Sequence, residues 1–201
     1  MLTIGLTGPS GAGKGTVARL FARFGVPSID TDAVYHELLL PPSACLDELV
    51  AAFGGKILTP DGNLNRPALA ALVFAPEQAD RLATLNRITH RHILDRVRTI
   101  CCEYEAQGVA AVLIDAPVLF ESGFDRECDR TLAVLADPSV RLSRIMARDG
   151  LSEAAALARM AAQPADDFYI SRADVTIYDD TAPDDLIPTV RRLLLDWGIA
   201  V

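Results

Sequence analysis

The chain has few of the residue types that hold metals or form disulfide frameworks. It contains four cysteines and three histidines among 201 residues. The cysteine spacing fits neither a zinc site nor a disulfide framework, so we expect free thiols in a reducing cytosol. His90 and His92 stand two apart on a predicted helix and would point in different directions, so we do not expect them to bind a metal together. The four cysteines are Cys45, Cys101, Cys102 and Cys128.

Positive charge and long apolar runs are also scarce. Lys and Arg number 19 against 27 Asp and Glu, for a net charge of −8. This balance argues against an extended nucleic-acid surface but allows a small basic pocket for phosphates. No apolar run reaches the roughly 18 residues of a membrane span, and no secretory signal begins the chain. We therefore expect a cytoplasmic protein with neither a nucleic acid nor a membrane as partner, and with no obligate protein partner.

Glycine, in contrast, is concentrated near the start of the chain. The run Gly-Pro-Ser-Gly-Ala-Gly-Lys-Gly-Thr occupies residues 8–16, directly after the apolar residues 2–7. A strand, a glycine-rich turn and a helix direct backbone N–H groups at phosphate, which is the P-loop arrangement. Lys14 would reach the outer phosphates, and an ordinary glycine-rich turn would not require it. The predicted triphosphate-binding residues are Gly8, Gly11, Ala12, Gly13, Lys14, Gly15 and Thr16.

Residue 15 departs from the usual P-loop pattern. It is glycine, so the hydroxyl that commonly ligates Mg²⁺ there is missing, and Thr16 supplies one a residue later. Gly-Lys-Gly-Thr is the form found in small-molecule kinases that resemble adenylate and cytidylate kinases. Mg²⁺ keeps several waters, so it can be held mainly by triphosphate oxygens and nearby carboxylates. We expect Thr16, Asp30 and Asp115 to serve the metal, mostly through water.

The hydrophobic pattern predicts an α/β fold. Strand-like runs at 2–7, 26–30, 109–115, 131–136 and 174–178 alternate with predicted helices at 14–24, 138–148, 152–163 and 184–196. This alternation predicts a doubly wound, five-stranded parallel sheet of the P-loop NTPase type. Residues 33–107 are far longer than an ordinary connection, and we interpret them as a helical substrate-binding insertion. Helical periodicity within it covers about 46–53, 67–74, 77–88 and 89–106.

Carboxylates follow two of the predicted strands. Asp30 and Asp32 come after the second strand, where strand ends face the ligand crevice of such sheets. They could serve Mg²⁺ through water and orient an attacking hydroxyl, or they could simply form a turn. Asp115 ends the third strand and resembles a Walker-B acid, although it could instead cap a turn. Pro117 follows it and would fix a rigid turn against the crevice.

Three arginines form a stripe on one predicted helix. Arg141, Arg144 and Arg148 are spaced by three and four residues. Like charges at this spacing disfavour a helix slightly, so an anionic partner is attractive. Arginines stabilise the charge on a moving phosphoryl group, and we expect this role chiefly for Arg144 and Arg148. A solvated basic face, eased by Asp137 and Asp149, is the alternative.

The order and spacing of further segments resemble one family, dephospho-CoA kinase, over nearly the whole chain. The segments are the P-loop, Ile-Asp-Thr-Asp at 29–32, Asp-Gly-Asn-Leu-Asn-Arg at 61–66 before an apolar stretch at 69–74, Leu-Asn at 85–86 with His90, Pro-Val-Leu-Phe-Glu at 117–121, and the stretches 144–150, 159–163 and 173–180. The resemblance implies transfer of a phosphoryl group from ATP to the ribose 3′-hydroxyl of dephospho-CoA, which is the last step of coenzyme A biosynthesis.

The resemblance also implies roles for particular residues. Asp32 would be the carboxylate near the attacking hydroxyl, and Arg144 and Arg148 would belong to a mobile lid. The chain would be one kinase domain with a core of 1–32, 108–137 and 172–201, an acceptor-binding insertion at 33–107 and a lid at 138–171. The catalytic set would be Asp32, Lys14, Arg144 and Arg148, and the acceptor-binding set Asp32, Arg66, His90, Pro117 and Glu121.

Two residues depart from the family pattern, and other functions remain open. Gly15 replaces the usual Ser, and Asp180 stands where the family usually has Asn near the adenine, so no adenine contact is assigned.

The P-loop also looks very like that of cytidylate kinase, whose acceptor is a nucleotide phosphate. A regulatory switch that binds GTP would need an Asn-Lys-x-Asp motif, which is absent. A decayed kinase with a structural role is disfavoured by the intact Lys14, Asp32, Arg144 and Arg148.

Overall fold

The computed structural model describes residues 1–74, 79–180 and 182–200. The chain divides into two compact units. Unit 1 comprises Met1–Ile29 and Glu103–Val201, and unit 2 comprises Asp30–Cys102. Unit 2 covers most of the predicted insertion 33–107, while the functional division into core, insertion and lid stays a prediction. No helix within the described part of the chain has both the length and the apolar character needed to cross a membrane.

A five-stranded sheet organises unit 1 and confirms the predicted fold class. The strand order is β2-β3-β1-β4-β5, and the pairs β1–β3, β1–β4 and β4–β5 are parallel. Parallel neighbours require crossover connections, which the intervening helices provide. The observed strands lie within one or two residues of the predicted limits. They are β1 (Leu2–Thr7), β2 (Ser28–Asp30), β3 (Ala111–Asp115), β4 (Arg130–Leu135) and β5 (Val175–Tyr178).

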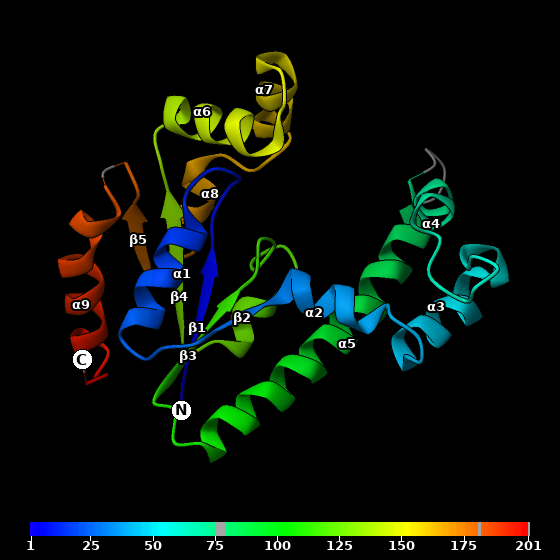
Figure 1. The fold of residues 1–201 in the computed structure, drawn as a ribbon, viewed down its shortest axis with the longest axis horizontal. Helices are drawn as coiled ribbons and strands as arrows, with labels where there is room; N and C mark the ends of the chain where they lie inside the picture. The colour runs from blue at the N-terminus through cyan, green and yellow to red at the C-terminus, as the bar shows by residue number, and fades with distance from the viewer. Residues whose placement is uncertain (75–78, 181, 201) are drawn as a thin grey trace. The chain divides into compact units, whose positions relative to one another are not determined.

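Helices cover both faces of this sheet. On one face, α1 (Lys14–Arg23) and α9 (Ile187–Asp196) lie side by side and share a core with β1 and β4 (Figure 1). On the other face, Tyr169 of α8 (Asp166–Ile170) packs on Ala133 and Leu135 of β4. Two of the 3₁₀ turns in this unit are η2 (Phe124–Glu127) and η3 (Pro183–Leu186). Helix α8 was not expected, because five residues are too few for a helical period to stand out.

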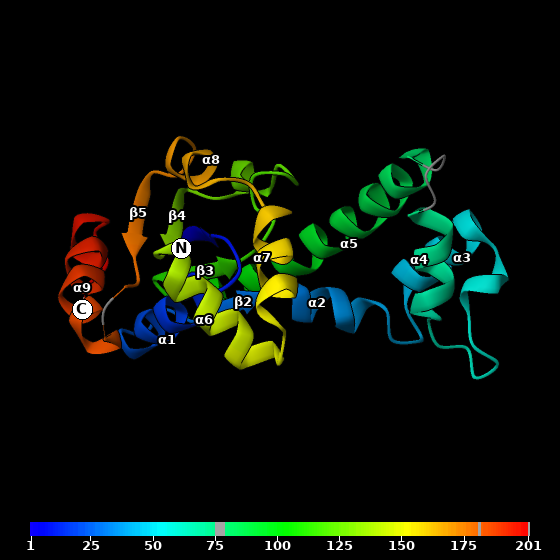
Figure 2. The ribbon, with the colours of Figure 1, turned by 90° about the horizontal axis from the view of Figure 1, so that it is seen from above.

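Capping residues set the limits of the two helices that follow β4. Asp137 accepts from the N–H of Ser139 at the start of α6 (Pro138–Asp149), whose first residue is proline. Ser152 accepts from the N–H of Ala155 at the start of α7 (Glu153–Ala161). Both N-caps confirm the predicted helix starts. The two helices pack against each other, as both views show (Figures 1 and 2).

Unit 2 is helical around its own apolar core. Its elements are α2 (Thr31–Leu38), α3 (Ala44–Phe53), η1 (Gly55–Ile57), α4 (Arg66–Val73) and most of α5 (Ala79–Ala106). Leu49, Ile57, Leu69 and Ile88 are buried together in this core.

The two stretches of helical periodicity at 77–88 and 89–106 belong to a single helix. Helix α5 runs without a break from Ala79 to Ala106. No Gly or Pro interrupts this stretch, and Ile88 and Thr89 at the supposed junction are both buried. Residues 77 and 78 of the first predicted helix lie outside the described residues.

Candidate active site

The P-loop joins β1 to α1 in a conformation that glycine permits. Gly8 has φ +141° and Gly13 has φ +97°, both in the region that L-residues with side chains rarely adopt. A Cβ on Gly8 would lie 2.1 Å from the carbonyl oxygen of Val134, and one on Gly13 would lie 1.8 Å from Oδ2 of Asp179. The loop is therefore pressed against β4 and against the residue that follows β5.

The side chains expected to hold phosphate lie together at this loop. Lys14 is the first residue of α1, and its Nζ donates to the carbonyl oxygen of Gly8 over 3.0 Å. The Thr16 hydroxyl accepts from Nη2 of Arg19 over 3.1 Å. The ammonium group thus lies over the loop whose N–H groups, with the N-terminus of α1, form a site for anions.

The arginine stripe of α6 contacts the P-loop directly. Arg141 donates from Nε to the carbonyl oxygen of Ser10 over 3.1 Å, and Arg144 donates from Nη1 to that of Gly11 over 3.3 Å. Arg148 donates from Nη2 to Oγ of Ser10 over 3.2 Å. The three residues therefore share one face of α6, as their spacing predicts, and this face contacts the loop.

The three arginines differ in burial. Arg141 is only 6% exposed and also pairs with Asp166 over 3.4 Å, so it holds the loop and α8 together inside the protein. Arg144 and Arg148 are more exposed and can reach a ligand. A phosphate contact remains a prediction for both of them.

Asp149, the last residue of α6, forms ion pairs with two arginines. Its carboxylate accepts from Nε of Arg148 over 2.8 Å and also binds Arg159 of α7. The Arg148 hydrogen bond, with the charges of both arginines, lowers the pKa of Asp149 to about 2. Gln163, just after α7, accepts from the N–H of Ser10 over 3.0 Å. Helix α6, through Arg148, and the segment directly after α7, through Gln163, thus contact the P-loop.

Asp179 is a residue of this site that the sequence reasoning missed. It follows β5, is 1% exposed and lies against Gly13, with Oδ2 3.2 Å from Nη1 of Arg144. Burial raises the pKa of Asp179, and the Arg144 charge opposes that rise. Its neighbour Asp180 is exposed and accepts from the N–H of Asp137 over 2.6 Å. The position of Asp179 at a strand end, the reasoning applied to Asp115, was the signal that could have found it.

The end of β3 brings two further expected residues to unit 1. Asp115 is half-buried and pairs in register with Leu6 of β1, one residue before that strand ends. The carbonyl oxygen of Pro117 accepts from the Thr7 hydroxyl over 3.2 Å. Asp115 and Pro117 therefore lie beside the strand that enters the P-loop. Glu121 is exposed on the following loop.

The remaining expected residues belong to unit 2. Asp30 caps α2, since its Oδ1 accepts from the N–H of Asp32 over 2.9 Å and of Ala33 over 3.1 Å. Asp32 is exposed in the first turn of that helix. The Asp30 carboxylate thus stabilises the local backbone at the start of α2, and a role toward the metal stays a prediction.

Two further unit 2 residues from the expected set lie on α4 and α5. Arg66 is the first residue of α4 and donates from Nη2 to Nδ1 of His36 over 3.1 Å, so that ring nitrogen is an acceptor. His90 is half-buried in α5, and burial lowers its pKa.

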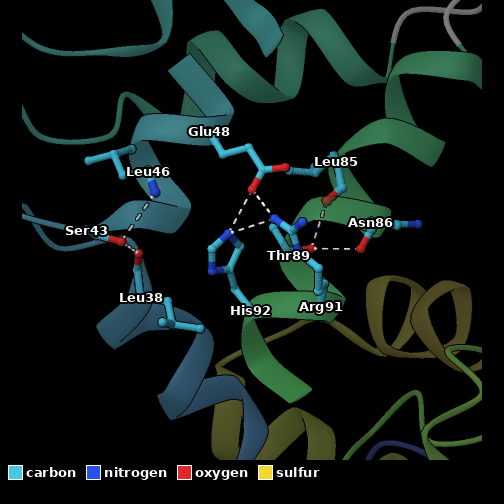
Figure 3. A network of polar contacts seen from close by, with 9 residues as sticks. All are labelled: Leu38, Ser43, Leu46, Glu48, Leu85, Asn86, Thr89, Arg91 and His92. Carbon is cyan, nitrogen blue, oxygen red and sulfur yellow. Dashed lines mark hydrogen bonds and ion pairs between the residues drawn. The ribbon is translucent and has the colours of Figure 1, made fainter. Parts of the chain in front are cut away.

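A separate polar network ties α3 to α5 (Figure 3). Glu48 binds Nε2 of His92 over 2.9 Å and also contacts Arg91. The hydrogen bond with His92 keeps the pKa of Glu48 below its ordinary value. His92 is therefore occupied by a carboxylate of its own unit, and the network stabilises the helix pair.

The donors near the P-loop suit a magnesium ion held largely by its ligand. Among residues 1–74, 79–180 and 182–200, no three His, Cys, Asp or Glu side chains group closely enough to hold a metal. The Thr16 hydroxyl and the Asp115 carboxylate supply hard oxygen donors in unit 1. Mg²⁺ prefers oxygen ligands and retains water, so phosphate oxygens could complete its shell.

Comparison with known proteins places this site in context. The family model described as dephospho-CoA kinase matches residues 2–185. The dephospho-CoA kinase of Corynebacterium efficiens is 39% identical over 196 residues, which are 98% of this chain and 97% of that protein. The structure of TT1252 from Thermus thermophilus is similar with a TM-score of 0.79 at 32% identity, covering 97% of each chain. Dephospho-CoA kinase from Campylobacter jejuni has the same fold, with a TM-score of 0.68 at 23% identity over 97% of this chain and 96% of that one.

Proposed function

The chain belongs to the dephospho-CoA kinase family, and from this premise we propose how its residues perform the reaction. The activity is ATP-dependent phosphorylation of the ribose 3′-hydroxyl of dephospho-CoA, which yields CoA and ADP. The observation that supports the proposal best is the convergence of Lys14, Arg144 and Arg148 on one P-loop. Phosphoryl transfer requires positioning and charge stabilisation more than covalent catalysis, and this arrangement supplies both.

We propose that the P-loop N–H groups and Lys14 hold the β- and γ-phosphates of ATP. Binding would draw the Lys14 ammonium from the Gly8 carbonyl oxygen to the more negative phosphate oxygens. The guanidinium groups of Arg144 and Arg148 would neutralise charge on the moving phosphoryl group. Mg²⁺, when bound with ATP, would supply positive charge that stabilises the phosphates, and Thr16, Asp115 and Asp30 would help to hold it, mostly through water.

Asp32 is proposed as the group that orients the 3′-hydroxyl and takes its proton. The hydroxyl oxygen forms the new bond to the γ-phosphorus, the bond from that phosphorus to the β–γ bridging oxygen breaks, and ADP leaves with that electron pair. Asp32 is exposed in the first turn of α2, so a substrate can reach its side chain. Arg66, His90, Pro117 and Glu121 are proposed to hold the rest of dephospho-CoA.

We propose the cytoplasm as the location and residues 138–171 as a lid. The four cysteines form no disulfide, which suits a reducing compartment. The contacts of Arg148 and Gln163 with Ser10 would let this segment respond to phosphate at the P-loop and exclude water during transfer.

Product analysis tests the proposed function. Purified protein with ATP and Mg²⁺ is given dephospho-CoA, CMP or no acceptor, and ADP and CoA are measured. We expect ADP and CoA in equal amounts with dephospho-CoA and little ADP otherwise. Faster phosphorylation of CMP would favour the cytidylate kinase alternative, and nucleotide binding without any acceptor-dependent ADP would favour a regulatory switch.

A further inference from the structure

Asp179 is a buried carboxylate to which the proposed reaction assigns no task. It is 1% exposed, and its N–H donates to the carbonyl oxygen of Leu135 over 2.8 Å, which anchors its backbone to the end of β4. No geometrically good hydrogen bond reaches either carboxylate oxygen among the described residues, and the nearby charge partner is the guanidinium of Arg144. Oδ2 faces Gly13 so closely that a Cβ there would lie 1.8 Å away. A carboxyl group is thus buried directly beneath the phosphate-binding loop.

A negative charge at this position is unfavourable beside a site for phosphates. Removing a carboxylate from water is costly unless an opposite charge accompanies it. Burial accordingly raises the pKa of Asp179, and the adjacent charge of Asp180 adds to the rise. The opposing positive charges are Arg144, with Oδ2 3.2 Å from its Nη1, and Arg19 as a weaker contributor. Arg144 is therefore the main group that makes the buried charge tolerable.

Arg144 is held at one nitrogen by two partners. Its Nη1 lies 3.3 Å from the carbonyl oxygen of Gly11 and 3.2 Å from Oδ2 of Asp179. A planar guanidinium fixed at one corner keeps its other N–H groups for a further anion. Its side chain is 36% exposed, so a ligand can reach it.

We propose that Asp179 is a positioning residue that holds the guanidinium of Arg144 at the P-loop, so that the remaining N–H groups are preorganised for the phosphates of ATP. Asp179 touches neither ATP nor the acceptor in this role and acts through Arg144. Asp179 would support the phosphate contact proposed for Arg144, so the inference rests on the proposed function. A carboxylate that merely filled space under Gly13 would act through its shape and not through its charge.

The variant Asp179→Asn separates charge from shape, because the two side chains are nearly the same size. We expect kcat to fall about tenfold as the charged contact to Arg144 weakens. The dissociation constant of ATP should change less, within about threefold, because loss of a nearby negative charge favours ATP while looser positioning of Arg144 disfavours it. The KM for dephospho-CoA should not change. Circular dichroism and thermal unfolding check the fold, and Asp179→Ser replaces the asparagine variant if the latter does not fold.

A double-mutant cycle with Arg144→Ala tests whether Asp179 acts through the arginine. Arg144→Ala alone should lower kcat about 10²-fold and weaken ATP binding, because it leaves the buried carboxylate uncompensated. Adding Asp179→Asn should lower kcat no further and should tighten ATP binding several-fold relative to Arg144→Ala. An effect of Asp179→Asn that depends in this way on the presence of Arg144 is not expected from a residue that only supports the loop by packing.

Asp180→Asn is the matched control. Asp180 is the next residue, and its exposed carboxylate accepts from the N–H of Asp137. The variant therefore removes the same charge without touching the contact with Arg144, and its kcat should stay within about twofold of the wild type. A wild-type kcat in Asp179→Asn would overturn the inference. So would an Asp179→Asn substitution that lowers kcat by the same factor in the wild type and in Arg144→Ala. Loss of kcat in Arg144→Ala beside a normal Asp179→Asn would overturn it while leaving the proposed function intact. A wild-type protein that does not phosphorylate dephospho-CoA would instead overturn the proposed function.

Discussion

The guanidinium of Arg148 donates a hydrogen bond from Nη2 to Oγ of Ser10 over 3.2 Å. The same group binds Asp149 through Nε and Nη2 over 2.8 and 2.9 Å. Arg148 therefore spans the distance between α6 and the P-loop. A phosphoryl group at the loop would compete with Asp149 for these N–H groups, which makes Arg148 a direct test of the arginine stripe.

Arg148→Ala is expected to lower kcat by about 10- to 100-fold, because a contact to the migrating phosphoryl group strengthens in the transition state. Steady-state kinetics with saturating ATP measures the effect. Arg159→Ala is the matched control, since Arg159 binds the same Asp149 from α7, and the kcat of this variant should stay within about threefold of the wild type. Equal losses in both variants would show that only the Asp149 network matters.

Lys14→Met should lower kcat/KM for ATP by at least about 100-fold, because methionine keeps the length of the side chain and removes the ammonium that would hold the outer phosphates. The bond to Gly8 is lost as well, so thermal unfolding is measured beside activity. A native circular-dichroism spectrum with unchanged kcat/KM would remove Lys14 from the site.

Asp32→Asn should lower kcat by about 10²- to 10⁴-fold, as expected for loss of a general base, while the dissociation constant of ATP changes little. Rapid-quench kinetics and ATP titration measure the two quantities. A large loss of ATP binding would instead assign Asp32 to the metal.

Asp30 supplies the comparison. Asp30→Asn should retain the α2 cap and most of the activity, because asparagine caps helices as well as aspartate does. Asp30→Ala should lose about 1 kcal/mol of stability with the cap. A kcat for Asp32→Asn similar to that of Asp30→Asn would contradict the distinct role proposed for Asp32.

Gly15→Ser should be tolerated and should lower the Mg²⁺ concentration needed for half-maximal activity. Gly15 is the second residue of α1, and the nearest atom to a Cβ there is Nη1 of Arg19 at 3.7 Å, an ordinary contact. Serine also favours a helix over glycine by about 0.5 kcal/mol, so thermal stability should rise slightly. Gly15→Ala is the control, since it adds the Cβ without the hydroxyl. An unchanged Mg²⁺ requirement in both variants would show that residue 15 does not reach the metal shell.

Acid should weaken the network around Asp149. Its pKa is about 2 in the folded protein, below its ordinary value of 3.8, because Arg148 and Arg159 favour the charged form. The stabilisation is therefore complete above the ordinary pKa and is lost as the pH falls through the folded pKa. The difference in melting temperature between the wild type and Asp149→Asn should shrink steadily from pH 5 to pH 2. A difference independent of pH would mean that the charge of Asp149 does not stabilise the fold.

Local features were predictable wherever the signal lay within a few residues. Proline at the first position of α6 after Asp137, and Ser152 before α7, specified where those helices begin. The P-loop was recognisable because its glycines, lysine and flanking apolar residues are contiguous. The two periodic stretches in α5 were not recognisable as one helix, because periodicity over a short window cannot show whether one helix continues into the next.

The contacts between segments were not predictable in the same way. The spacing of the arginines placed them on one face of α6, but it did not show that this face meets Ser10 and Gly11. Likewise, the sequence did not distinguish Asp30 from Asp32. In the structure Asp30 caps α2, and Asp32 is exposed. These assignments depend on backbone direction and on partners distant along the chain.

The sequence alone determined the α/β class, the phosphate-binding loop and the likeness to dephospho-CoA kinase, because short-range periodicity and contiguous motifs encode them. The tertiary structure decided which charges meet at that loop. Gly13 and Asp179 are 166 positions apart, and only the pairing of β4 with β5 and of β1 with β4 brings that carboxylate beneath the P-loop. The physical reason is that burial and charge pairing are properties of neighbours in space, which the order of residues along the chain does not reveal.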